Sequence, residues 1–193
     1  MVLVIDSSSP CLALAVVGDD GTRESVFVFG GREHDLPGRA LALADPRRLK
    51  AVAVGLGPGS FTGLRVGVSY GVGLAMGLGV PLLGFGSLDL QAARADEPVT
   101  ALIEAGRGRL YWQEPGGAPR IGDPAELPRG PAAVGWLRPP TVEAVRAAGV
   151  RLLPDEDLRE FAQAAARLLG TAEELGYDTV KLKYMQSFWT MRE

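Results

Sequence analysis

Residues 55–67 read Gly55-Leu56-Gly57-Pro58-Gly59-Ser60-Phe61-Thr62-Gly63-Leu64-Arg65-Val66-Gly67. The apolar run Leu49–Val54 comes before them, and a segment rich in small residues continues to Gly79. This order predicts a buried strand, a tight glycine and proline turn, and a helix over Thr62–Leu78. Ser60 or Thr62 is expected to cap that helix.

Glycine recurs inside the predicted helix at Gly63, Gly67, Gly71, Gly73 and Gly77. Each interior glycine destabilises a helix by about 0.5–1 kcal/mol relative to alanine. Repeated glycine therefore predicts that another backbone approaches this helix closely. Two sources of that backbone remain open, a partner protein or the chain's own core.

The glycine loop itself has two interpretations. Free N–H groups at a helix N-terminus can bind phosphate, or the loop is a tight turn without a ligand. A P-loop is excluded because Leu64 and Arg65 follow Gly63 where Lys and Ser or Thr are required. Asp6 ends the first apolar run, where it could hold a metal or water near a phosphate, or cap a turn. The candidate phosphate or turn residues are Asp6, Ser7, Gly57, Gly59 and Ser60.

Composition restricts the class of protein. The 193 residues are 47% hydrophobic and carry a net charge of −3, with arginines and lysines scattered, so a nucleic-acid-binding surface is not expected. The one cysteine, Cys11, is flanked by apolar residues and fits a buried side chain in a reducing compartment. No signal peptide or membrane span is evident, which favours a cytoplasmic location.

The remaining pattern predicts strands and short helices. The expected strands of the first half are Val2–Ile5, Leu12–Val17, Ser25–Phe29 and Val80–Phe85, with helices over Arg39–Ala44 and Leu88–Ala95, the latter capped by Ser87. The second half should contain strands at Val99–Ile103, Arg109–Gln113, Ala132–Gly135 and Val150–Leu153, and helices over Thr141–Ala148 and Asp155–Leu169. Both halves open with a strand and a hairpin, which suggests two lobes, 1–97 and 98–193.

Several motifs together resemble one family. They are Val4-Ile5-Asp6-Ser7-Ser8, Arg32-Glu33-His34, Gly57–Gly67, Gly79–Gly84 and Tyr111-Trp112. These stretches are similar to the TsaB family, also called YeaZ, over residues 1–113 and weakly beyond. The resemblance implies an α/β, two-lobed fold of the actin and Hsp70 type, in which each lobe is a ribonuclease-H-like mixed sheet with helices. Here the second lobe is reduced.

The resemblance also implies a function. Family members support the synthesis of N6-threonylcarbamoyladenosine at position 37 of tRNA, by pairing with the catalytic paralogue TsaD, which a small ATPase, TsaE, joins. They form homodimers when the paralogue is absent, and tRNA is contacted only through the complex. No membrane partner and no cofactor are expected, although the lobed fold leaves ATP binding conceivable.

The residues agree with a non-catalytic subunit. The paralogue holds its metal with two histidines, and the matching positions here are Ser87 and Gln91, which are poor ligands for a transition metal. The chain has one histidine, His34, interpreted as an exposed loop residue, so neither a second site of that type nor a Ser–His triad can be built. Catalytic and metal-binding residues are therefore predicted to be absent. An ATP-dependent phosphotransferase using Asp6, Ser7 and the loop is the alternative, and a metallopeptidase is disfavoured.

In the family the glycine-rich helix and the helix before it meet the partner. Helical spacing puts Arg65, Ser69, Gly73 and Met76 on one face, which we predict to be the partner interface. Leu64, Val68, Val72 and Ala75 lie on an adjoining face, which should pack on the chain's own sheet. The connection Gly30–Asp45 is shorter than usual in the family, so the first interface helix is expected to be truncated.

Overall fold

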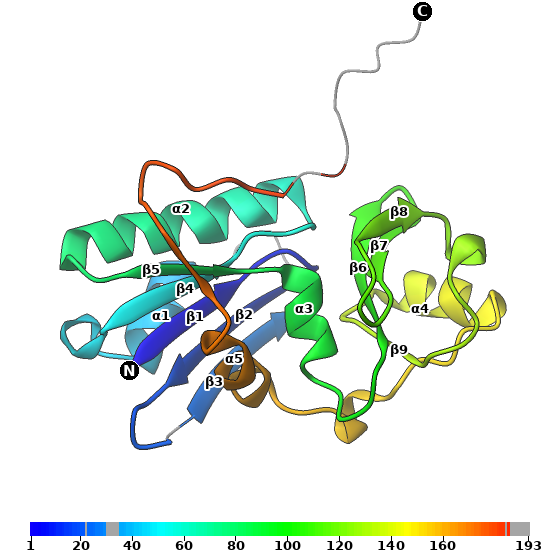
Figure 1. Cartoon of the computed structure of the whole chain (residues 1–193), viewed down its shortest axis with the longest axis horizontal. Coiled ribbons are helices and arrows are strands. Elements are labelled where there is room, and N and C mark those ends of the chain that lie inside the picture. Colours follow the sequence, from blue (N-terminus) through cyan, green and yellow to red (C-terminus); the bar gives the residue numbers. More distant parts are fainter. Residues whose placement is uncertain (22, 30–34, 184, 186–193) are drawn as a thin grey trace, which may run out of the picture.

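The computed structural model of the chain is an α/β structure with two mixed β-sheets (Figure 1). It describes residues 1–21, 23–29, 35–183 and 185, so His34 and the aromatic residues Tyr184, Phe188 and Trp189 lie outside the described part. The strands are β1 (Val2–Asp6), β2 (Cys11–Val17), β3 (Arg23–Phe29), β4 (Ala51–Gly55), β5 (Leu82–Phe85), β6 (Thr100–Gly106), β7 (Arg109–Gln113), β8 (Arg120–Gly122), β9 (Ala133–Val134) and β10 (Glu173–Leu175). The helices are α1 (Leu36–Leu43), α2 (Phe61–Leu78), α3 (Ser87–Ala92), α4 (Pro139–Ala147) and α5 (Phe161–Leu169), with single 3-10 turns at Pro46–Arg48, Pro124–Glu126 and Asp155–Asp157.

The first sheet has the strand order β10-β5-β4-β1-β2-β3. Strands β1, β4 and β5 are parallel to one another, whereas β2, β3 and β10 pair antiparallel with their neighbours. A meander of three strands followed by two parallel strands is the ribonuclease-H-like arrangement. The parallel pairing brings the carboxyl ends of β1 and β4 together, so the Asp6 turn and the glycine loop lie side by side.

Helices cover both faces of this sheet (Figure 1). On one face, Leu3 and Ile5 of β1 pack with residues of α1 and α2 in a single apolar cluster. On the other face, Val4 packs in a cluster with Phe161 and the alanines of α5. The apolar run of β1 is continuous rather than alternating because both of its faces are buried.

The second sheet has four strands in the order β8-β7-β6-β9. Here the faces alternate strictly along β6. Leu102 packs with Val145 of α4, while Ala101 and Ile103 pack with Leu88 of α3. Helix α3 therefore lies between the two sheets and joins their cores.

The sequence-based elements were correct in type for most of the chain, with a few exceptions. Strands β8 and β10 were missed because each has three residues of which only one is apolar, so neither forms an apolar run. The expected strand Val150–Leu153 is reduced to an isolated bridge between Leu152 and Ala133.

The expected helix over Asp155–Leu169 was wrong at its start, because it is a 3-10 turn followed by α5. The cause is Arg159. Its backbone N–H donates to the carbonyl of Arg94 (2.8 Å), and its guanidinium donates to the carbonyls of Ala93 and Ala95 at the end of α3. Contacts to α3 replace the helical hydrogen bonds at this point.

The division into residues 1–97 and 98–193 stays a proposal. The elements α5 and β10, near the end of the chain, contact the first sheet rather than the second, because α5 packs on β2 and β3 while β10 pairs with β5. We therefore use "first lobe" for the six-stranded sheet with its helices, and "second lobe" for the four-stranded sheet with α4.

Candidate functional site

Helix α2 is capped at both ends by residues typical of helix termini, a serine and a glycine. The Ser60 side chain accepts a hydrogen bond from the N–H of Gly63 (3.2 Å), so Ser60, not Thr62, is the N-cap. Gly79 ends the helix in the left-handed conformation with φ of 65°. Between them, Leu64, Val68 and Ala75 are buried and Val72 is partly buried in the core below, as the predicted sheet-facing stripe requires.

The five glycines of α2 divide into two groups. A Cβ atom at Gly63 would overlap the carbonyl oxygen of Ser7, and one at Gly67 would overlap the Ser7 hydroxyl. A Cβ at Gly71 would overlap Val54 of β4. These three glycines let α2 lie directly on β4 and on the end of β1 with the turn that follows it.

Gly73 and Gly77 differ, because a Cβ at either position would have no atom within 4 Å. Both glycines are exposed to solvent, and nothing in the described part of the chain accounts for their missing side chains. The chain's own core therefore explains Gly63, Gly67 and Gly71, whereas a partner protein stays the interpretation for Gly73 and Gly77.

The predicted interface residues lie together on the outer face of α2. Arg65, Ser69, Gly73 and Met76 are all exposed, and Met76 leaves 57% of its surface open. Val66, which the prediction omitted, is 51% exposed beside Arg65. At the start of the helix the Arg65 guanidinium stacks 3.7 Å from the ring centroid of Phe61. We call the set Phe61, Arg65, Val66, Ser69, Gly73, Met76 and Gly77 the outer face of α2.

The glycine loop packs tightly against the turn after β1. Gly57 has φ of 98°, a conformation that favours glycine, and its peptide bond to Pro58 is cis. The N–H of Ser60 donates to the carbonyl of Ser8 (2.6 Å), and the Ser7 hydroxyl donates to the carbonyl of Gly63 (2.8 Å). A Cβ at Gly59 would overlap the Ser8 backbone. The loop and the turn thus satisfy each other's polar groups.

Asp6 lies at the centre of this contact and is 1% exposed. Its carboxylate accepts hydrogen bonds from the Ser8 hydroxyl (3.0 Å), the Ser8 N–H (3.3 Å) and the Ser87 hydroxyl (3.0 Å). Ser87 in turn accepts from the N–H of Gly57 (3.1 Å). Burial raises the pKa of Asp6 to about 6, and the hydrogen bonds from Ser8 and Ser87 only partly offset that effect. Asp6 therefore ties together β1, the glycine loop and α3.

The expectation that the Ser87 side chain caps the helix at residue 88 was wrong. The N-cap of α3 is Gly86, without a side-chain hydrogen bond, because the Ser87 hydroxyl is turned inward to Asp6. Gln91, which the resemblance led us to expect at the second metal-ligand position of the paralogue, is fully buried on the same helix. Among the described residues, no group of three His, Cys, Asp or Glu side chains could hold a metal ion.

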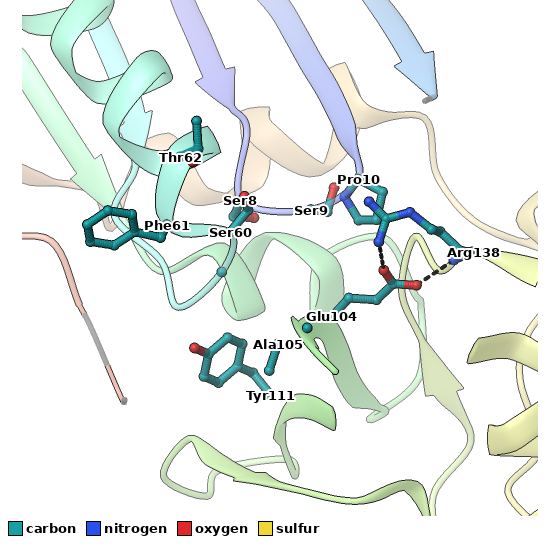
Figure 2. Close-up of a pocket in the computed structure, with 12 residues that line it drawn as sticks. Ser8, Ser9, Pro10, Ser60, Phe61, Thr62, Glu104, Ala105, Tyr111 and Arg138 are labelled. Atoms are coloured by element: carbon teal, nitrogen blue, oxygen red, sulfur yellow. Dashed lines mark hydrogen bonds and ion pairs between the residues drawn. The ribbon is translucent and has the colours of Figure 1, made fainter. Parts of the chain in front are cut away.

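A cleft of about 380 Å³ opens between the two lobes (Figure 2). One wall is the turn Ser8–Pro10 and the start of α2, where Ser60, Phe61 and Thr62 lie. The facing wall comes from the second lobe and includes Glu104, Tyr111 and Arg138. Of the candidate phosphate residues, the structure brings Gly59 and Ser60 to this cleft, whereas Asp6, Ser7 and Gly57 do not line it.

The second-lobe wall contains an ion pair that sequence reasoning missed. Glu104, whose side chain is 8% exposed, accepts hydrogen bonds from the Arg138 guanidinium (2.6 Å), the Arg138 N–H (2.7 Å) and the Thr141 hydroxyl (2.7 Å). The carboxylate thereby binds the N-terminus of α4, where negative charge is favourable. The available signal was a lone acidic residue at the end of the apolar run Val99–Ile103, which parallels Asp6 after β1.

The one cysteine adds no nucleophile to the site. Burial raises the pKa of the Cys11 thiol to about 12, so this thiol is not a nucleophile near neutral pH. No helix among the described residues is long and apolar enough to cross a membrane.

The chain is similar to known proteins in both sequence and structure. The sequence profile of the family "TsaD: tRNA N6-adenosine threonylcarbamoyltransferase" matches residues 39–125. The tRNA threonylcarbamoyladenosine biosynthesis protein TsaB of Escherichia coli is 34% identical over 128 residues, which cover 58% of this chain and 54% of that protein. TsaB of Bacillus subtilis is 30% identical over 120 residues, covering 57% and 52%. The chain thus spans about half the length of these curated relatives.

The fold has a counterpart among solved structures. YeaZ from Pseudomonas aeruginosa superposes with a TM-score of 0.72 at 22% sequence identity, over 95% of this chain and 99% of that one. The similarity extends through both sheets, whereas the sequence matches cover little more than half of the chain.

Proposed function

Because the chain belongs to the TsaB/YeaZ family, we propose that it is a non-catalytic subunit in the synthesis of N6-threonylcarbamoyladenosine in tRNA. In this proposal it pairs with a TsaD-like paralogue through the outer face of α2, and a TsaE-like ATPase joins the pair. Without the paralogue it forms a homodimer through the same face. tRNA is contacted through the complex, and the chain acts in the cytoplasm.

The observation that carries the interface is the pair of open glycines. Gly63, Gly67 and Gly71 are explained by contact with β1 and β4, but Gly73 and Gly77 have open space where their side chains would stand. A helix that keeps two such glycines gives up about 0.5–1 kcal/mol for each. A partner backbone that packs close to the helix axis would account for that loss, since small residues allow interaxial distances near 8 Å.

The surroundings of these glycines suit a protein partner. Val66 and Met76 flank them on the outer face and leave about half of their surface exposed. Apolar side chains grouped on one face indicate an interaction surface more than scattered ones do. Arg65, stacked on Phe61, adds a cation at the edge of the face.

The burial of the Asp6 carboxylate supports the non-catalytic role. A carboxylate that assists phosphoryl transfer must reach a metal ion or a nucleophile. Asp6 is instead enclosed, with hydrogen bonds from Ser8 and Ser87. For these reasons the phosphotransferase alternative is disfavoured. Titration calorimetry with ATP and Mg²⁺ tests it directly, since tight binding with turnover would favour it over the scaffold.

The test of the proposed function is reconstitution of tRNA modification. Purified TsaD-like and TsaE-like proteins would be incubated with tRNA, an activated threonylcarbamoyl donor, ATP and Mg²⁺, with and without this chain. We expect the modified nucleoside to accumulate only when the chain is present. Equal yields in both reactions would overturn the proposal.

A further inference from the structure

Residues 176–183 together with Met185, which we call the strap, follow β10 and contact parts of the molecule that are distant in sequence. Residue 184 is outside the described part. The strap begins at the far end of α2, because the Tyr177 hydroxyl donates to the carbonyl of Val80 (2.7 Å) just beyond that helix. Figure 1 shows it running beside α2 toward the end of the helix that faces the second lobe.

The middle of the strap is held on the first lobe by alternate side chains. Val180 and Leu182 pack on the apolar core beneath α2, whereas Lys181 and Lys183 are exposed. This alternation is that of an extended segment with one face buried. The N–H of Lys183 then donates to the carbonyl of Leu56 (2.8 Å), so the strap reaches the glycine loop.

The strap contacts the loop at its most constrained residue. The Lys183 carbonyl oxygen lies 3.1 Å from the position that a Cβ of Gly57 would occupy. Gly57 is the residue that donates to Ser87, and Ser87 donates to Asp6. The strap therefore packs against the outside of the hydrogen-bonded network that holds the loop to α3.

The last described residue of the strap packs at the junction of the two lobes. Met185 packs on the cluster formed by Leu88, Ala101, Ile103 and Tyr111, between α3 and the second sheet. Tyr111 also forms part of the wall of the cleft between the lobes. One short segment thus contacts α2, the glycine loop and the side chains behind the cleft wall.

We propose that the strap is an intramolecular latch that fixes the orientation of the two lobes and thereby sets the width of the cleft between them. Its anchors on the first lobe are Tyr177, Leu182 and the Lys183 N–H, and its anchor on the second lobe is Met185. Release of Met185 frees the second lobe to move about α3 while the first lobe stays folded. This role is independent of the proposed function, because it needs no partner.

The test measures the distance between the lobes in the full chain. Spin labels at Arg47→Cys on the first lobe and Glu143→Cys on α4 report that distance, since both positions are exposed and Cys11 is buried. We expect a narrow distribution in the parent protein and one at least twice as wide in Met185→Asp and in Leu182→Asp. The matched control is Lys181→Asp, which places the same charge on the exposed side of the strap and should leave the distribution narrow.

Hydrogen exchange at the Lys183 amide shows whether the strap has been released. A distribution that stays narrow in a folded Met185→Asp variant, or in Leu182→Asp while this amide loses its protection, would overturn the latch. If Met185→Asp does not fold, Met185→Ser and a chain that ends at Lys183 take its place, with the same expected widening. An unchanged width in those variants would equally contradict the proposal.

Discussion

The glycines of α2 allow a comparison of two variants in which the gain in helix propensity is the same and cancels. Gly71 and Gly73 lie two residues apart in the middle of the same helix, so replacing either with alanine gains the same intrinsic helix propensity, about 0.5–1 kcal/mol. The two positions differ only in their surroundings. A methyl group at Gly73 meets open space, and one at Gly71 overlaps the buried Val54.

The magnitudes follow from that difference. Gly73→Ala should raise the free energy of unfolding by the propensity gain alone, which for a domain of this size is a rise in Tm of about 1–4 °C. Gly71→Ala must also move α2 away from β4 or reorient Val54, and such overpacking costs about 1–3 kcal/mol. Gly71→Ala should therefore be less stable than Gly73→Ala by about that amount.

Thermal unfolding followed by circular dichroism, together with urea denaturation, measures both variants against the parent. The reasoning would be refuted if Gly73→Ala lowered the stability of the isolated monomer, or if the two variants were equally stable. Because the chain is expected to self-associate, the measurement is made at several protein concentrations and extrapolated to the dilute limit.

Three further predictions concern the buried polar groups. Asp6→Asn should stabilise the chain at pH 7 and above by up to about 3 kcal/mol. The pKa of Asp6 is about 6 in the folded state against an ordinary value of 3.8, so the stability that the neutral acid provides is lost as pH rises through about 6, and asparagine stays neutral. Urea unfolding at pH 4 and pH 7.5 checks that the gain disappears at the lower pH. Ser87→Ala leaves the Gly57 N–H and the Asp6 carboxylate each short of a buried partner and should destabilise by about 2–4 kcal/mol; chemical denaturation measures this, and a loss below 0.5 kcal/mol would contradict the network. Glu104→Ala should lower stability by about 1–2 kcal/mol, because the N-terminus of α4 loses its acceptor while the exposed Arg138 side chain is hydrated by solvent. Hydrogen exchange should locate the loss in α4 and β6, so that uniform loss over the first sheet would count against it.

Much of the first lobe could be predicted from sequence, and for physical reasons. The continuous apolar runs of β1 and β4 are too short for buried helices and so indicate strands buried on both faces. The glycine and proline turn defines the start of α2 without tertiary information. Helical spacing likewise separated the buried residues of α2 from the exposed ones, because that periodicity is a property of the helix alone.

What the sequence could not provide depends on contacts between distant segments. Whether a glycine of α2 faces the sheet or solvent was undecided until Ser7 and Val54 were placed beneath it. The break before α5 arises from hydrogen bonds between Arg159 and the end of α3, 64 residues away. Strand β10 is too short to show any periodicity and is defined by its pairing with β5.

The binding role of the outer face of α2 is tested most directly by affinity for the TsaD-like paralogue, measured by titration calorimetry with two variants of this chain. Gly73→Trp fills the open space on the outer face, and Gly130→Trp places the same side chain in open space on an exposed loop of the second lobe. We predict that Gly73→Trp weakens pairing at least a hundredfold while its circular dichroism and Tm stay close to those of the parent, and that Gly130→Trp binds as the parent does. Unchanged affinity in a folded Gly73→Trp variant would contradict the assignment of this face to the partner.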